Sequence, residues 1–117
     1  MGNKIEKFED ILAWQKAQEL VILIYGELRN CKDYAFRDQL QRATVSIMNN
    51  IAEGYERKGN KEFAKFLYIA KGSCGEVRSM LYLALKLRYI QKDKCDLLLN
   101  NCLIISRMLS NFIKAIQ

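Results

Sequence analysis

Residues 42–81 read RATVSIMNNIAEGYERKGNKEFAKFLYIAKGSCGEVRSML and contain two amphipathic patterns separated by a basic break. Apolar residues recur three and four positions apart on both sides of that break, as they do in helices packed on a common core. Lys58-Gly59 predicts the end of the first helix, because glycine readily adopts the left-handed conformation that follows a helix. Asn60 predicts the N-cap of the second helix. We therefore expect helices at residues 36–57 and 61–87.

The same period continues towards both ends of the chain, which contains no proline. Two further helices are predicted at residues 11–29, with Asp10 as N-cap, and at residues 92–115. Four long helices joined by short linkers are typical of an antiparallel up-down-up-down bundle, and the 117 residues suffice for one such domain, 1–117. The expected core stripes are Trp14, Ala17, Leu20, Val21, Ile24, Tyr25 and Leu28; Phe36, Leu40, Ala43, Ile47 and Ile51; Phe63, Phe66, Leu67, Ala70, Cys74, Val77, Leu81, Ala84 and Leu85; and Leu98, Cys102, Ile105, Leu109, Phe112 and Ile116.

A second apolar surface is predicted in addition to this core. The last helix carries two apolar stripes, and Leu12, Ile22 and Leu23 lie on the outer side of the first helix. Two glycines inside the third helix cost about 1 kcal/mol each relative to alanine, and they allow another backbone to approach closely. A bend, or packing within the chain, is the alternative explanation. Because a monomeric bundle exposes less apolar surface than this, we expect a homo-oligomer. The predicted interface residues are Tyr68, Gly72, Gly75, Ser79, Leu97, Ile104 and Met108.

The charge of the chain is uneven. The net charge is +6, and residues 39–117 carry thirteen basic and six acidic side chains, against six and seven in residues 1–38. This asymmetry is compatible with a polyanionic partner. Lysine and arginine neutralise phosphates, and repetition around an oligomer axis would turn a few of them into a charged belt. A solvated helix face that only keeps the protein soluble is the alternative. The predicted phosphate contacts are Arg57, Lys58, Lys61 and Lys65.

Residues suited to catalysis or metal binding are few. The absence of histidine excludes a histidine acid–base relay and a Glu-x-x-His di-iron site, and neither a phosphate-binding glycine loop nor a nucleophile elbow is present. Glu53 and Glu76 are expected near core-facing positions, where they could meet and bind a metal or share a proton, or simply satisfy buried amides or pair with an arginine. The cysteines form no CxxC pair and are interpreted as core residues. We expect no enzyme activity, no cofactor and no metal.

The expected location is the cytoplasm. The charged N-terminus shows no secretory signal, and the longest apolar run, residues 20–25, is too short to cross a bilayer. No membrane association is therefore predicted.

The motifs QRATVSI (41–47), NIAEGY (50–55), KEF (61–63) and FLYIAKGS (66–73) resemble those of the four helix bundle protein family, also called 23S ribosomal RNA intervening-sequence proteins. FED (8–10), WQKA (14–17) and ISRML (105–109) match its beginning and end. The resemblance implies a bundle that assembles into a ring, typically a pentamer, encoded in inserts of bacterial large-subunit rRNA genes or elsewhere in bacterial genomes. It also implies similarity to the accessory variability determinant of diversity-generating retroelements, a basic pentameric barrel that binds nucleic acid and a reverse transcriptase. Met48 stands where the family commonly has proline, so a kink expected there is in doubt.

Two functions remain after these observations. The first is a non-enzymatic homo-oligomer that binds the backbone of RNA or DNA through its basic surface. The second is a structural or adaptor protein whose ring recruits another protein, for example a nucleic-acid-processing protein, while its charge serves only solubility. A small-molecule or metal-binding bundle would require a ligand retained through purification.

Overall fold

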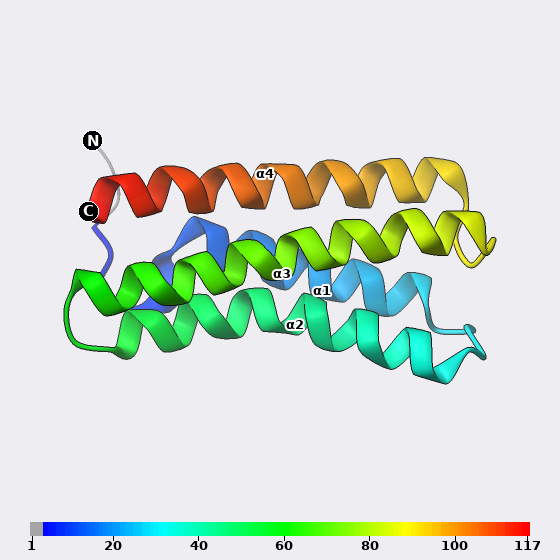
Figure 1. Ribbon diagram of the computed structural model, residues 1–117, viewed down its shortest axis with the longest axis horizontal. Coiled ribbons are helices and arrows are strands. Elements are labelled where there is room, and N and C mark those ends of the chain that lie inside the picture. The colour runs from blue at the N-terminus through cyan, green and yellow to red at the C-terminus, as the bar shows by residue number, and fades with distance from the viewer. Residues whose placement is uncertain (1–3) are drawn as a thin grey trace.

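The computed structural model describes residues 4–117, which form four long helices and one short 3-10 helix, with no strand in that range. The elements are η1 (Phe8–Asp10), α1 (Leu12–Glu27), α2 (Tyr34–Glu56), α3 (Asn60–Lys86) and α4 (Lys92–Ile116). The helices lie along the longest axis of a body measuring 42 × 27 × 19 Å, with the α2–α3 connection at one end and the other two helix connections at the opposite end (Figure 1). The all-helical fold expected from the sequence is confirmed, and the helix bounds agree to within two residues.

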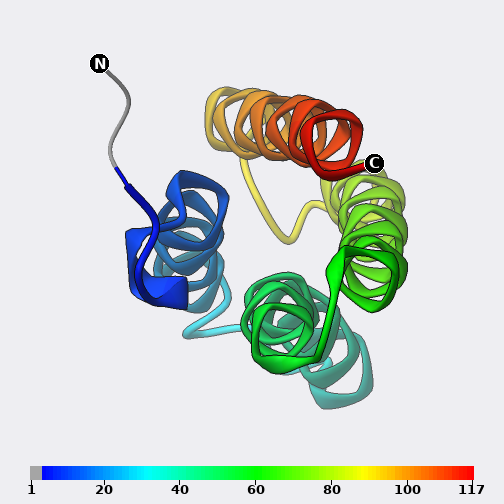
Figure 2. The ribbon, with the colours of Figure 1, turned by 90° about the vertical axis from the view of Figure 1, so that its left-hand side faces the viewer.

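Each helix packs against two of the other three. α1 contacts α2 and α4, and α3 also contacts α2 and α4, whereas no Cα pair within 8 Å joins α1 to α3 or α2 to α4. Seen along the long axis, α1 and α3 therefore occupy opposite corners of the bundle (Figure 2). Side chains from all four helices fill the space between them and form one hydrophobic cluster.

The core matches most of the predicted stripes. All five predicted residues of α2 are buried, because positions three and four apart return to the same side of a helix. Tyr25 was wrongly assigned to the core, since 44% of its surface is exposed. Other members of the predicted stripes lie at the edge of the core and are only partly buried, namely Trp14, Val21, Phe66, Leu85, Phe112 and Ile116.

Two predicted helix caps are wrong. Asp10 lies inside η1, where its Oδ2 accepts a hydrogen bond from the Glu6 amide at 3.0 Å, and Ile11 takes the N-cap position of α1. Asn60 is the first residue of α3, and Gly59 is its N-cap with a φ of 83°. Glycine adopts this conformation without the penalty that a Cβ atom brings. Gly59 therefore sets the start of α3, while α2 already ends at Glu56 with extended backbone at Arg57.

The middle of α2 is continuous through Met48, so the helix has no break at the position where the family commonly has proline. A small polar cluster follows directly. The Asn50 amide nitrogen Nδ2 donates to the Ser46 carbonyl at 2.8 Å and lies 2.9 Å from Ser46 Oγ. Ser46 Oγ in turn lies 3.0 Å from Ser73 Oγ of α3. These hydrogen bonds satisfy polar groups at the α2–α3 interface, where an unpaired group would be costly.

Candidate nucleic-acid and assembly surfaces

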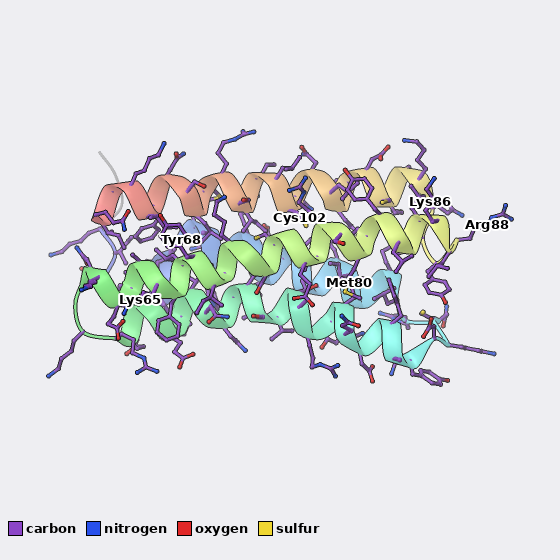
Figure 3. The ribbon with its side chains drawn as sticks, in the orientation of Figure 1. Lys65, Tyr68, Met80, Lys86, Arg88 and Cys102 are labelled. Atoms are coloured by element: carbon purple, nitrogen blue, oxygen red, sulfur yellow. The ribbon has the colours of Figure 1, made fainter. Side chains whose placement is uncertain are left out.

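The four predicted phosphate contacts gather at the connection between α2 and α3. Arg57 follows the last residue of α2, Lys58 lies in the turn, and Lys61 and Lys65 belong to the first two turns of α3. All four side chains are exposed. We call these four residues the basic turn. Figure 3 shows Lys65 at this end of α3 and Lys86 at the opposite end.

Neighbouring groups hold Arg57 in place. Its Nη2 donates to Glu53 Oε1 at 3.0 Å, and its guanidinium carbon lies 5.1 Å from the centre of the Phe66 ring. The ion pair is exposed and the Phe66 ring is half-buried, so each contact contributes only modestly to stability. Their effect is to fix the guanidinium beside the end of α2 and to neutralise part of its charge.

The three lysines of the basic turn differ in their carboxylate contacts. Lys65 Nζ lies 3.4 Å from Glu62 Oε2. Within residues 4–117, neither Lys58 nor Lys61 lies within ion-pair distance of a carboxylate. Beside them, the N-terminus of α3 receives no side-chain cap. Uncapped amide groups at a helix N-terminus favour anions. This end of the protein can therefore bind phosphate through its lysine side chains and through backbone amides.

The predicted interface residues of α3 share its outer face. Tyr68, Gly72, Gly75 and Ser79 are all exposed, and we call this set the α3 outer face. A Cβ atom added at Gly72 or Gly75 would meet no heavy atom within 4 Å. Packing within the chain therefore does not explain why glycine occupies either position.

The predicted interface residues of α4 lie on a different side of the bundle. Ile104 lines a cavity of about 400 Å³ between α1 and α4, together with Lys16, Glu19, Ile22, Leu23, Asn101 and Ile105. Met108 lines a second cavity of about 230 Å³ between the same helices, with Ile5, Asp10, Ile11, Leu12, Ala13 and Phe112. We call these two cavities together the α1–α4 groove. Leu97 lies on the same α4 stripe as Ile104, two turns earlier, and is 49% exposed.

Glu53 and Glu76 do not face the core, contrary to the sequence-based expectation, because both side chains are exposed. Glu53 pairs with Arg57 four residues later on the surface of α2. Within residues 4–117, no group of three histidine, cysteine, aspartate or glutamate side chains is arranged to hold a metal ion.

Three of the four cysteines belong to the core, as predicted. Cys74, Cys95 and Cys102 are buried, whereas Cys31 is half-buried in the loop after α1. Burial raises the pKa of Cys74 and of Cys102 to about 12, because a thiolate is poorly solvated among apolar side chains. These thiols are therefore protonated at neutral pH and are poor nucleophiles.

Three exposed apolar or aromatic side chains of α3 were not identified in the sequence. Ile69 is 52% exposed, Tyr82 is 54% exposed, and Leu83 is 48% exposed on the same side of the helix as Lys65 and Gly72. The signal was available, because Leu83 follows Lys65 by eighteen residues, which is five helical turns.

Two comparisons with known proteins cover most of the chain. The model of the family "23S rRNA-intervening sequence protein" matches residues 9–111. The chain belongs to this family. No curated protein matches it. It is similar to a protein of unknown function from the S23 ribosomal protein family of Bacteroides thetaiotaomicron, whose crystal structure superposes with a TM-score of 0.82 at 25% sequence identity. That comparison covers 88% of this chain and 99% of the Bacteroides chain.

The family match includes the basic turn, the α3 outer face and α4 up to residue 111. The sequence motifs that resembled the family thus identified it correctly. None of the helices within residues 4–117 has the length and apolar character needed to span a membrane.

Proposed function

We propose that this member of the 23S rRNA-intervening sequence protein family is a non-enzymatic, homo-oligomeric bundle that binds the backbone of RNA or DNA through the basic turn. The observation that carries the proposal is the position of Lys58 and Lys61. Both are exposed, both are free of carboxylate partners within residues 4–117, and both stand beside the uncapped N-terminus of α3. The similar Bacteroides protein has no known function, so this proposal rests on the residues of the present chain.

Phosphate contact is the chemistry that these groups offer. A lysine ammonium is a point charge with three donors, and it binds phosphate without reading the base. The expected ligand is therefore recognised by the charge of its backbone rather than by its base sequence.

Assembly makes this binding stronger. One basic turn offers few phosphate contacts, and a solvated lysine pair on a monomer binds weakly. A homo-oligomer, with a pentamer as the expected form, repeats the basic turn around its axis and multiplies the contacts with one nucleic acid. Exposed apolar side chains on α1, α3 and α4 support self-association.

The test is binding of a fluorescent structured RNA and of a matched DNA duplex, measured by anisotropy at several salt concentrations. On duplex DNA, log affinity should fall with log salt by about 0.9 per neutralised phosphate. The double variant Lys58→Glu/Lys61→Glu should bind much more weakly at equal oligomer mass.

The matched control is Lys32→Glu/Lys94→Glu, which makes the same change in total charge at the opposite end of the bundle, where both lysines are exposed. It should retain most of the affinity and most of the salt dependence. Equal losses in the two double variants would mean that overall charge, rather than the basic turn, drives binding. No saturable binding by the wild-type protein near physiological salt would contradict the proposal and favour the adaptor function.

A further inference from the structure

The assembly residues predicted from the sequence occupy two separate surfaces. Tyr68, Gly72, Gly75 and Ser79 form the α3 outer face, whereas Ile104 and Met108 line the α1–α4 groove. α1 and α3 do not contact each other and stand at opposite corners of the bundle (Figure 2). A single continuous patch therefore cannot contain both sets. If both take part in assembly, each copy contributes two different surfaces.

The α1–α4 groove is an incompletely filled apolar surface. Leu12 and Ile22 on its α1 side are 60% and 65% exposed, which is unusual for large aliphatic side chains. Its two cavities, of about 400 and about 230 Å³, are lined on the α4 side only by uncharged residues. The groove thus offers apolar contact along two helices, and an inserted helix would cover it.

The α3 outer face has the shape needed for such an insertion. Gly72 and Gly75 leave the middle of this face without side chains, so the backbone of α3 can come close to another surface. Each glycine costs about 1 kcal/mol relative to alanine in a helix interior. Nothing in the same chain lies within 4 Å of the Cβ position at either residue. A contact from another copy would supply the compensation that the protomer lacks.

Charge favours the pairing of these two different surfaces over the pairing of like with like. From Tyr68 to the end of α3, residues 68–86 carry three basic side chains and one acidic side chain. The charged side chains that line the groove are Asp10, Lys16 and Glu19, which are two acidic and one basic. Two α3 outer faces brought together would bring like charges close, whereas α3 against α1 brings opposite charges close.

We propose that the α3 outer face of one copy docks in the α1–α4 groove of the next, in a head-to-tail contact. The inference rests on the self-association included in the proposed function. Because the contact is heterologous, a dimer leaves one groove and one α3 outer face free, and these are satisfied only when the chain of copies closes into a ring. The docking surface begins at Tyr68, so Lys58 and Lys61 remain beyond its end.

The experiment uses two variants, each damaged on one surface only, and measures mass by size-exclusion chromatography with light scattering. Gly75→Arg places a bulky charge on the α3 outer face at a position where an added Cβ atom meets nothing within 4 Å, so the fold should be retained. Leu23→Glu places a charge in the groove at a side chain that is 40% exposed. Each variant alone should have the mass of one chain, 13.6 kDa, and an equimolar mixture should form a dimer and nothing larger. The mixture should form a dimer because the intact groove of Gly75→Arg accepts the intact α3 outer face of Leu23→Glu.

Controls separate this result from general effects of charge and from misfolding. Gln39→Arg and Gln39→Glu introduce the same side chains at an exposed position of α2 and should retain the wild-type mass. If Leu23→Glu loses helical circular dichroism, Ile22→Glu replaces it, since that side chain lines the same cavity and is 65% exposed.

Three results would overturn the docking proposal. They are a monomeric wild-type protein, a mixture of the two variants that stays monomeric, and full assembly of either variant alone, which would indicate a contact between like surfaces. Anisotropy with RNA and DNA on the same samples keeps the two questions apart. A monomeric wild-type protein that still binds nucleic acid through Lys58 and Lys61 would overturn the docking and leave the basic turn as the binding surface.

Discussion

The Tyr89 hydroxyl donates a hydrogen bond of 2.6 Å to Asp33 Oδ2, joining the loop before α2 to the loop after α3 across 56 residues of sequence. Asp33 also caps α2, because its Oδ1 accepts from the Phe36 amide at 3.2 Å. The Tyr89 ring meets the Phe36 ring edge to face, with 5.3 Å between centroids. One carboxylate thus holds a helix start and a distant loop at the same end of the bundle.

Replacement of Tyr89 by phenylalanine should lower the stability of the protein and make that loss depend on pH. The Tyr89 hydrogen bond, followed by that of the Phe36 amide, lowers the pKa of Asp33, and the bond to Asp33 raises the pKa of Tyr89. The Asp33 contribution is therefore present above its ordinary pKa of 3.8 and is lost as the pH falls through the lowered value. The Tyr89 contribution is present below its ordinary pKa of 10.0 and is lost as the pH rises through the raised value.

Urea denaturation of the wild-type protein and of Tyr89→Phe should accordingly differ most in midpoint between these two pH limits. The difference should shrink at both extremes. Tyr34→Phe is the control, because its hydroxyl makes no hydrogen bond within residues 4–117 and its ring is exposed. A constant difference across the whole range would mean that the hydroxyl acts through something other than the Asp33 carboxylate.

The substitution Gly54→Ala should destabilise the protein, although alanine normally stabilises a helix interior relative to glycine by about 1 kcal/mol. Gly54 is buried where α2 meets α3, and an added Cβ would lie 2.5 Å from Phe66 Cβ and 3.0 Å from Phe63 Cδ1. Because Phe66 Cβ is bonded directly to the backbone of α3 and cannot rotate away, the two helices must move apart. Gly26→Ala is the matched control, since nothing lies within 4 Å of its Cβ position. Thermal unfolding should show a lower midpoint for Gly54→Ala and an equal or higher one for Gly26→Ala.

Gly54 also illustrates what the sequence could and could not predict. Periodicity located the four helices, because large apolar side chains such as Leu40, Ile47 and Ile51 repeat on one side. Gly54 continues that buried side, but hydrophobic periodicity does not identify a buried position at which the residue has no side chain. The contact that brings α2 close to α3 was therefore not visible.

The errors about caps and carboxylates have a different cause. Asp10 and Asn60 have good capping side chains, but neighbouring residues shift each helix start by one position. Glu53 was placed near the core although one residue corresponds to a rotation of about 100° in a helix, so a small error in the centre of a stripe moves a side chain from core to solvent. The division of the assembly residues between two surfaces depends on how the helices are arranged in space, which no pattern within a single helix contains.

Thiol reactivity should distinguish the loop cysteine from the core cysteines. Cys31 is half-buried, and its Sγ lies 3.9 Å from the Asp33 carbonyl, whereas the other three are buried. With burial raising the pKa of Cys74 and Cys102 to about 12, those thiols are almost entirely neutral at pH 8. An aromatic disulfide reagent should react rapidly with one thiol in the native protein and with all four in denaturant. The variant Cys31→Ser should lose the rapid phase; a rapid phase that persists would show that the core opens on the timescale of the reaction.

The substitution Glu53→Gln should increase affinity for nucleic acid. Glu53 pairs with Arg57 at 3.0 Å and so offsets a charge of the basic turn. Glutamine removes the negative charge and releases the guanidinium, which can then contact a phosphate. Because the pair is exposed, with both side chains more than half accessible, the fold should be unaffected. Anisotropy at low salt should show tighter binding of the same labelled RNA.

Asp96→Asn gives the matched control for this prediction, since Asp96 forms a similar exposed pair with Lys92 at 2.9 Å on α4, away from the basic turn. It makes the same change in net charge but should leave affinity nearly unchanged. Raising the salt concentration should reduce the gain of Glu53→Gln, because the gain is electrostatic. If both variants bind more tightly by the same factor, affinity follows net charge and Arg57 has no particular role as a phosphate contact.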